Sequence, residues 1–317
     1  MAKNIIVSNR LPIRTSKVEN SFKFTATSGG LATGMKTVHE HEDSLWVGWP
    51  GIGIDEIAPN AWAPLAIDLE ENNYAPVLLD KEEVDNFYYG LANKCLWPLF
   101  HYFLEIATFS ESHWETYVEV NKKFSQSVID KIAPGDTVWI HDYQLLLCPK
   151  MIKDARPDVN IGFFLHIPFP SFEIFRTFPC REALLEGMLG ADLIGFHTYD
   201  YERHFLSSVK RILRKEVQFN RVINGLREVV VDTFPMGIDY DKFYSKAKEH
   251  LAQKEDEKSE LKKQLELHKK GSESGKLILS IDRLDYTKGV LNRIKAFDLF
   301  LTKYPEYLEK VRLLMLT

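Results

Sequence analysis

Short runs of apolar residues recur along most of the chain, and stretches with a helical spacing of apolar positions lie between them. The run at 160–165 is apolar on both faces, and the run at 137–140 follows a Pro-Gly-Asp turn. Continuous apolar strands that alternate with helices are typical of a parallel sheet covered on both faces. The pattern therefore predicts a doubly wound α/β fold. The predicted strands are 5–8, 44–48, 75–79, 137–140, 160–165, 192–196 and 229–234, and the predicted helices include 118–132, 144–155, 180–189 and 199–213.

The composition changes after residue 239. Residues 246–276 are rich in Lys and Glu with scattered Leu, which favours a solvated helix ending near Gly271, although a coiled coil or partner-binding helix is an alternative. A second α/β unit then begins, with a strand at 277–281, a helix at 290–301 and a strand from 310. We therefore expect a complete Rossmann-like N-terminal domain over 1–240 and the beginning of a second, incomplete one over 241–317.

Composition restricts the function classes. The chain has 317 residues, of which 45% are hydrophobic and 27% charged, and its net charge of −5 argues against a general nucleic-acid-binding role. The sequence has three cysteines, Cys95, Cys148 and Cys180, and no CxxC motif. An odd number of widely spaced cysteines favours reduced thiols in a cytoplasmic protein. The N-terminal apolar run is too short for a signal peptide, and no apolar stretch is long enough to cross a bilayer, so a membrane partner is not expected.

A basic loop close to the C-terminus is the clearest candidate site. The strand at 277–281 leads into the sequence Asp-Arg-Leu-Asp-Tyr-Thr-Lys-Gly at 282–289, and a helical pattern follows. Arg283 and Lys288 therefore lie between the carboxyl end of a strand and the start of a helix. Two cations in that position suit a phosphate or diphosphate.

Two segments near the N-terminus have a similar character. Arg10 follows the first strand, where ligands of open α/β sheets bind, and its guanidinium suits a phosphate, although an Arg on an exposed loop is the plain alternative. Gly29 and Gly30 precede a stretch of small residues, so their backbone N–H groups could approach an anion. The pair matches no dinucleotide or Walker motif, and a tight turn explains it equally well.

Polar and aromatic residues complete the set. Tyr88 and Trp97 have flat faces that suit stacking on a sugar, although such residues are more often part of a core. Asp142 and His166 end two consecutive strands and should converge on one crevice. Asp142 could accept a hydrogen bond from a sugar hydroxyl or cap a helix, and His166 could contact a reacting sugar or be a satisfied buried histidine. The four candidate metal ligands share no metal-ligand spacing, which disfavours a metal site; they are His101, His141, His166 and His197.

Taken together, these segments resemble the trehalose-6-phosphate synthases, a family of retaining glycosyltransferases with the GT-B fold of two Rossmann-like domains. The resemblance extends over essentially the whole chain. The matching segments are 8–10, 28–32, 46–49, 96–98, 100–102, 139–143, 162–170, 192–196 and 283–289.

The resemblance implies transfer of glucose from UDP-glucose to glucose 6-phosphate with retention, giving trehalose 6-phosphate and UDP. It implies no metal or other cofactor, since cations of the protein would neutralise the leaving diphosphate. The implied roles are the acceptor phosphate for Arg10, the acceptor pocket for Tyr88, Trp97 and Asp142, the donor diphosphate for Gly29 and Gly30, the transferred glucose for His166, and the UDP diphosphate for Arg283 and Lys288. His166, Arg283, Lys288 and Asp142 would form the catalytic set.

Several alternatives stay open. The implied mechanism is front-face attack, whereas a double displacement would need a placed carboxylate. A related synthase with an acceptor such as glycerol 3-phosphate, and a non-catalytic sugar-phosphate sensor, are competing functions. Because the family's second domain extends well beyond residue 317, we expect this sequence to be a fragment with little or no activity alone. The full-length protein could form a homo-oligomer, and a phosphatase domain could follow.

Overall fold

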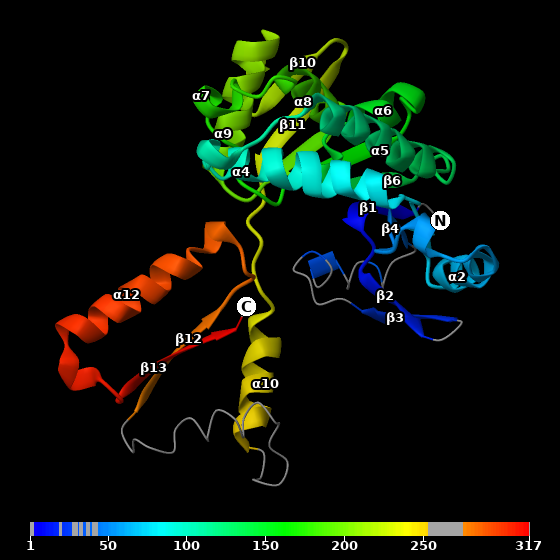
Figure 1. Cartoon of the computed structure of the whole chain (residues 1–317). Coiled ribbons are helices and arrows are strands. Elements are labelled where there is room, and N and C mark those ends of the chain that lie inside the picture. The colour runs from blue at the N-terminus through cyan, green and yellow to red at the C-terminus, as the bar shows by residue number, and fades with distance from the viewer. Residues whose placement is uncertain are drawn as a thin grey trace. The chain divides into compact units, whose positions relative to one another are not determined.

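The computed structural model describes residues 3–18, 21–26, 31, 34–35, 39, 44–252 and 275–316 (Figure 1). Contacts divide the chain into two units, Met1–Met236 and Gly237–Thr317, and each is described by itself. The domain boundary that the sequence suggests at residue 240 stays a prediction.

The first unit contains a nine-stranded sheet in the order β5-β4-β1-β6-β7-β8-β11-β10-β9. All neighbours from β5 to β11 pair in parallel, and β10 and β9 add an antiparallel edge. The predicted α/β fold with a large parallel sheet is therefore confirmed. The strands are β1 (Asn4–Arg10), β4 (Ser44–Trp49), β5 (Tyr74–Pro76), β6 (Thr137–His141), β7 (Asn160–Phe164), β8 (Leu193–Phe196), β9 (Val217–Gln218), β10 (Arg221–Asn224) and β11 (Arg227–Thr233).

Three details differ from the prediction. The strand expected at 75–79 ends at Pro76, after which the N–H of Val77 still donates to the carbonyl of Gly48. A separate antiparallel hairpin, β2 (Ile13–Val18) with β3 (Ser21–Ala26), was not predicted. The expected helix at 118–132 begins earlier and is α5 (Glu111–Ile129).

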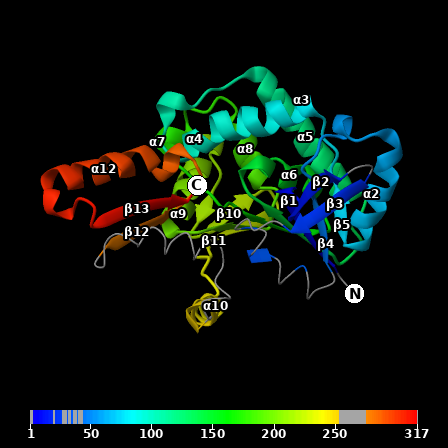
Figure 2. The ribbon, with the colours of Figure 1, turned by 60° about the horizontal axis from the view of Figure 1, so that its bottom comes forward.

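Helices α4 (Trp97–Phe100), α5, α6 (Cys148–Ala155) and α8 (Arg181–Met188) gather over the central strands (Figures 1 and 2). The alternation of strand side chains divides the core between the two faces of the sheet: Ile5 and Val7 of β1 join the larger buried cluster, and Ile6 joins a smaller one with residues of α2. The helical segments are η1 (Ile54–Glu56), α2 (Pro59–Glu71), α3 (Lys81–Glu83), η2 (Val84–Leu96), α4 (Trp97–Phe100), η3 (Leu104–Ile106), α5, η4 (Tyr143–Leu145), α6 (Cys148–Ala155), α7 (Phe172–Phe175), α8 (Arg181–Met188), α9 (Tyr199–Ser208) and η5 (Val209–Leu213).

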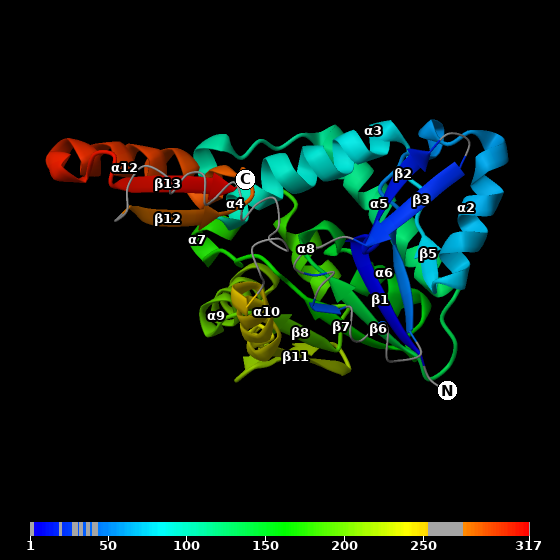
Figure 3. The same ribbon diagram turned by 90° about the horizontal axis from the view of Figure 1, so that it is seen from below.

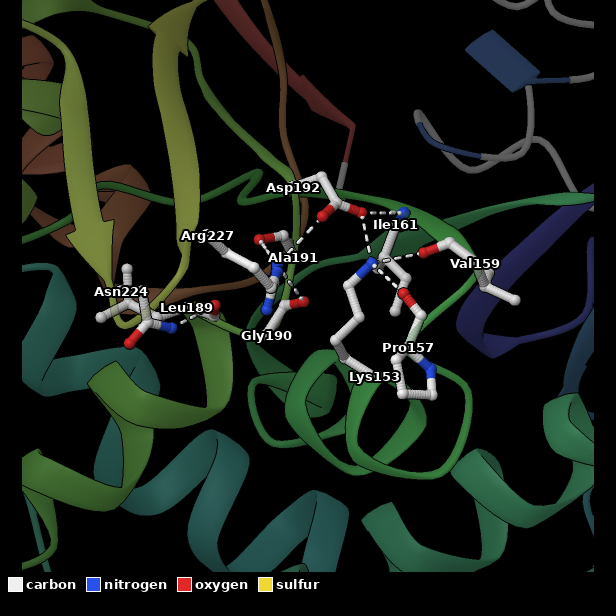
Figure 4. A network of polar contacts seen from close by, with 10 residues as sticks. All are labelled: Lys153, Pro157, Val159, Ile161, Leu189, Gly190, Ala191, Asp192, Asn224 and Arg227. Carbon is white, nitrogen blue, oxygen red and sulfur yellow. Dashed lines mark hydrogen bonds and ion pairs between the residues drawn. The ribbon is translucent and has the colours of Figure 1, made fainter.

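A polar network ties α6 to three strands of the sheet (Figure 4). The buried ammonium of Lys153 donates to Asp192 Oδ2 over 2.9 Å and to the carbonyl of Val159. The same carboxylate accepts from the N–H of Ile161 over 2.8 Å and from Arg227 over 3.0 Å. Asp192 therefore neutralises the charges of Lys153 and Arg227. It directly precedes β8, so this network lies at the amino ends of the parallel strands, and the candidate site lies at their carboxyl ends.

The second unit contains the parallel pair β12 (Lys276–Ile281) and β13 (Val311–Leu316), joined through α12 (Val290–Lys303), with α10 (Tyr240–Ala252) as a separate helix (Figure 3). The predicted strand and helix at 277–281 and 290–301 are thus present. Of the predicted charged helix, only the part up to residue 252 lies within the described residues, in α10. The remaining short elements are η7 (Tyr286–Lys288) and η8 (Pro305–Tyr307). No helix of the described residues has the length and apolar character needed to cross a membrane.

Replacing Asp192 by Ala should destabilise the first unit, because it leaves the cations of Lys153 and Arg227 without their shared carboxylate. We expect a loss of about 1.5–3 kcal/mol, the usual contribution of a hydrogen bond to a charged group. All six tryptophans lie in the first unit, so guanidinium chloride unfolding followed by tryptophan fluorescence reports on that unit. The control is Asp154→Ala, which removes an exposed helical pair with Lys150 worth roughly 0.3–0.5 kcal/mol. Equal effects of the two changes would contradict the role of the network.

Candidate active site

Arg10 ends β1 and is exposed, but its guanidinium is not a loosely held surface charge. Its central carbon lies 5.0 Å from the ring centroid of Trp49, which is its partner in the strand register. Gly51 also lies against the guanidinium: it has φ +84°, a backbone conformation that favours glycine, and a Cβ there would meet Arg10 Nη2 and displace the end of this side chain. Arg10 is therefore a positioned cation at a strand end.

Asp142 follows β6 with φ 77° and ψ 171°, a conformation that is essentially restricted to glycine. Its N–H donates to the carbonyl of Phe164 over 2.8 Å, and its Oδ1 accepts from the N–H of His166 over 3.2 Å. The residue holds the N-cap position of η4, but its side chain makes no capping hydrogen bond, so the helix-cap alternative does not explain it. Strain of this kind concentrates at functional sites.

Three histidines lie at the ends of β6, β7 and β8. His141 Nδ1 and His166 Nε2 are 3.1 Å apart, and the ring centroids of His166 and His197 are 5.6 Å apart. Burial, and secondarily His166, lowers the pKa of His141 to about 3; burial, with His197, lowers the pKa of His166 to about 4. Burial also lowers the pKa of His197. The rings are therefore neutral at physiological pH, and within the described residues no group of three or more potential ligands could hold a metal.

His141 and His166, the histidine pair, line a cavity of about 540 Å³ in the first unit. Its other walls are largely apolar and include Trp139, Phe164 and Met236. The low pKa of both rings follows first from their burial, which disfavours the charged form of the imidazole.

The predicted aromatic residues lie on the helical segment before α5. Trp97 begins α4, with its ring 4.1 Å from His101 and 5.6 Å from Tyr143, which directly follows Asp142. Tyr88 is half-buried on η2, and its ring lies edge-on to Tyr89 at 5.1 Å. The structure thus places the Trp97 ring against Tyr143, the residue after Asp142 in the chain. Gly29 and Gly30 lie outside the described residues, so their role stays a prediction.

In the second unit, Arg283 and Lys288 are both exposed on the loop between β12 and α12. Asp285 Oδ1 shapes this loop by accepting from the N–H and the hydroxyl of Thr287, over 2.8 and 2.7 Å. Gly289 then ends η7 with φ 62°, in the left-handed region that favours glycine. The loop therefore has a defined turn, and its two cations point from a fixed backbone.

Arg293 is a site residue that the sequence reasoning missed. Its guanidinium pairs with Asp282 Oδ2 over 2.9 Å, donates to the carbonyl of Lys288 over 3.0 Å and contacts the hydroxyl of Ser280. It thus holds both ends of the basic loop from the first turn of α12. A sequence signal exists, since a cation one turn into the helix faces back toward the loop, but the helical pattern alone does not show what this cation contacts.

The histidine pair should make the first unit less stable in mild acid. Each ring has a pKa of about 6.5 in the unfolded chain, far above the folded pKa of His141 and His166. Below pH 6.5 the unfolded state binds more protons, so stability falls with decreasing pH until the folded pKa is reached, by up to about 1.4 kcal/mol per pH unit for each ring.

The variant His141→Asn removes one of these groups. The pH dependence of the unfolding free energy should therefore become shallower by roughly half of 1.4 kcal/mol per pH unit at pH 6.5 and by nearly the full 1.4 at pH 5, as measured by denaturant unfolding with tryptophan fluorescence. His250→Asn in the second unit is the control and should leave that dependence unchanged. An identical pH dependence in the wild type and in His141→Asn would show that His141 does not stay neutral.

Comparison with known proteins places this geometry in a family. The model for glycosyltransferase family 20 matches residues 2–317. The alpha,alpha-trehalose-phosphate synthase (UDP-forming) of Pichia angusta is 42% identical over 322 residues, covering 98% of this chain and 65% of the relative. The bifunctional trehalose-6-phosphate synthase/phosphatase of Thermoproteus tenax is 42% identical over 314 residues, covering 96% of this chain and 41% of the relative. The chain thus spans only part of the length of these relatives.

Solved structures agree with the family model. The UDP-forming synthase from Burkholderia xenovorans matches with a TM-score of 0.81 at 29% identity, covering 99% of this chain and 64% of that one. An E. coli structure bound with UDP-2-fluoro glucose matches with a TM-score of 0.80 at 28% identity, covering 99% and 64%. These matches confirm the predicted GT-B type of fold. With a family model that covers almost every residue, the chain belongs to glycosyltransferase family 20.

Proposed function

We propose that the full-length protein transfers glucose from UDP-glucose to glucose 6-phosphate with retention, giving trehalose 6-phosphate and UDP. The observation that carries the proposal is the link between Asp142 and His166, in which a strained aspartate at one strand end fixes a neutral histidine at the next. Family membership and relatives named as UDP-forming trehalose-phosphate synthases support the same reaction.

The acceptor side of this proposal lies in the first unit. Arg10, held over Trp49, offers its planar guanidinium to the phosphate of glucose 6-phosphate, for which a forked donor is well suited. Asp142 accepts hydrogen bonds from sugar hydroxyls with its carboxylate, which also accepts from the backbone N–H of His166. Trp97 and Tyr88 supply apolar surface for the sugar ring.

The donor side depends on the loop of the second unit. Cleavage of the bond to UDP places negative charge on the diphosphate, and Arg283 and Lys288 would stabilise that charge more in the transition state than in the ground state. Arg293 keeps the loop in shape for this task. We infer that these fixed cations replace a catalytic metal. Gly29 and Gly30 would add backbone N–H groups to the diphosphate.

The chemistry assigned to the protein is front-face attack, with the acceptor hydroxyl and the leaving group on the same side of the sugar. His166 contacts the transferred glucose as a neutral ring, because its pKa of about 4 keeps it uncharged at physiological pH. The free thiols of Cys95, Cys148 and Cys180 support a reducing, cytoplasmic setting.

Replacing Arg10 by Ala should weaken the binding of glucose 6-phosphate roughly 10- to 100-fold, because a hydrogen bond to a charged group contributes about 1.5–3 kcal/mol. The affinity of Arg10→Lys should lie between those of the wild type and Arg10→Ala, since lysine keeps the positive charge but loses the forked donor geometry of the guanidinium. Isothermal titration calorimetry measures the effect. Arg203→Ala, which removes an exposed cation of α9, is the matched control. Equal affinities for Arg10→Ala and the wild type would remove Arg10 from the acceptor site.

The reaction itself is tested in the full-length protein by mixing UDP-glucose with glucose 6-phosphate and following UDP and trehalose 6-phosphate. Arg283→Ala and Lys288→Ala should each lower turnover about 10²-fold or more, as for a lost oxyanion contact. Lys303→Ala, at the far end of α12, is the control and should be close to wild type.

Three outcomes would contradict the proposal. UDP release that depends on glycerol 3-phosphate instead of glucose 6-phosphate would indicate another acceptor. Binding of glucose 6-phosphate without any turnover would indicate a sensor. Turnover within a few-fold of wild type in both loop variants would exclude Arg283 and Lys288 from the diphosphate role.

A further inference from the structure

The hydrogen bond between His141 and His166 has a direction that the surroundings decide. Nδ1 of His141 lies 3.1 Å from Nε2 of His166, so one ring donates and the other accepts. His141 is buried, and its second nitrogen, Nε2, is also buried and has no hydrogen-bond partner among the residues that the structure describes. The state of that second nitrogen therefore depends on which ring donates.

Only two arrangements are possible when both rings are neutral. If His166 donates from Nε2, His141 must carry its proton on Nε2, which leaves a buried N–H group without a hydrogen-bond partner among the described residues. If His141 donates from Nδ1, its Nε2 is a bare lone pair. Buried N–H groups without a partner are rarer in proteins than under-satisfied acceptors, so the second arrangement is favoured.

We propose that His141 is a positioning residue that donates its Nδ1 proton to His166 Nε2 and thereby holds His166 as the Nδ1–H tautomer. With Nε2 occupied, the ring nitrogen that His166 can offer to a ligand is Nδ1, and it offers a proton. His166 therefore binds an oxygen lone pair of the sugar as a fixed neutral donor and does not remove a proton. This inference deepens the proposed function and rests on it for the identity of the sugar.

The surroundings of His166 keep this donor in place. Asp142 Oδ1 accepts from its backbone N–H, which fixes the start of the loop after β7. The Phe164 ring lies 4.7 Å from the His166 ring, and the His197 ring lies 5.6 Å away on the next strand end. Rotation of the imidazole to exchange its two nitrogens would break the bond to His141 and meet these rings.

The tautomer can be measured directly by long-range ¹H–¹⁵N NMR of the histidine side chains in this chain, without substrate and without turnover. The His166 signal is assigned by its disappearance in His166→Gln. His204 is an internal reference, because its Nδ1 lies 3.1 Å from the carbonyl of Phe169 and a carbonyl only accepts. We expect His166 to show the same Nδ1–H pattern as His204. A proton on Nε2 of His166 in the wild type would overturn the proposal.

Two variants separate this role from simple packing. His141→Leu removes the donor, and His166 should lose the Nδ1–H pattern, whereas His141→Asn keeps an N–H near the position of Nδ1 and should retain it. A merely structural His141 would leave the tautomer of His166 unchanged in both variants, which would also overturn the proposal. Absence of glucosyl transfer in the full-length protein with the expected NMR pattern would refute the proposed function and leave the tautomer assignment standing.

Discussion

The parallel register of β6, β7 and β8 is the constraint on which the candidate site depends. His141 pairs with Phe164, and Phe164 pairs with Gly195, so the three strands end at the same level. A Cβ at Gly195 would lie 2.7 Å from the Phe164 ring, and only glycine leaves that ring its place beside His166. A slip of one residue would turn each of these side chains to the opposite face of the sheet.

The sequence predicted the fold well where burial leaves little choice. Strands β6 and β7 bury Val138, Ile140 and Phe163 on the face that packs in the larger core, and the other face borders the apolar cavity. A nearly continuous apolar run therefore marks these strands directly. The hairpin of β2 and β3 lacks that signal, because its residues are mixed in polarity and it pairs only with itself. The antiparallel edge of β9 and β10 is too short to create a pattern.

Individual site residues were predicted only as far as strand ends reveal them. The sequence predicted that Asp142 and His166 lie together, because consecutive parallel strands end at the same edge, and the hydrogen bond between them confirms that placement. The backbone conformation of Asp142 and the contact between the His141 and His166 rings could not be predicted, since both depend on the tertiary structure. Arg293 was missed for a similar reason: its contacts with Asp282, Lys288 and Ser280 are tertiary, and only its place one turn into α12 indicates them in the sequence.

The two units offer different chemistry to the proposed reaction. The strand ends of the first unit carry neutral imidazoles beside an apolar cavity, where a charged ring would be poorly solvated. The loop of the second unit carries two permanent cations on an exposed turn that Arg293 and Asp285 hold in shape. In glucosyl transfer from a nucleotide, negative charge grows on the leaving diphosphate, while the sugar becomes electron-poor. Cations near the sugar would oppose that change, and cations near the diphosphate favour it. The proposed chemistry therefore requires an uncharged hydrogen-bond donor such as His166 beside the sugar and positive charges such as Arg283 and Lys288 beside the diphosphate.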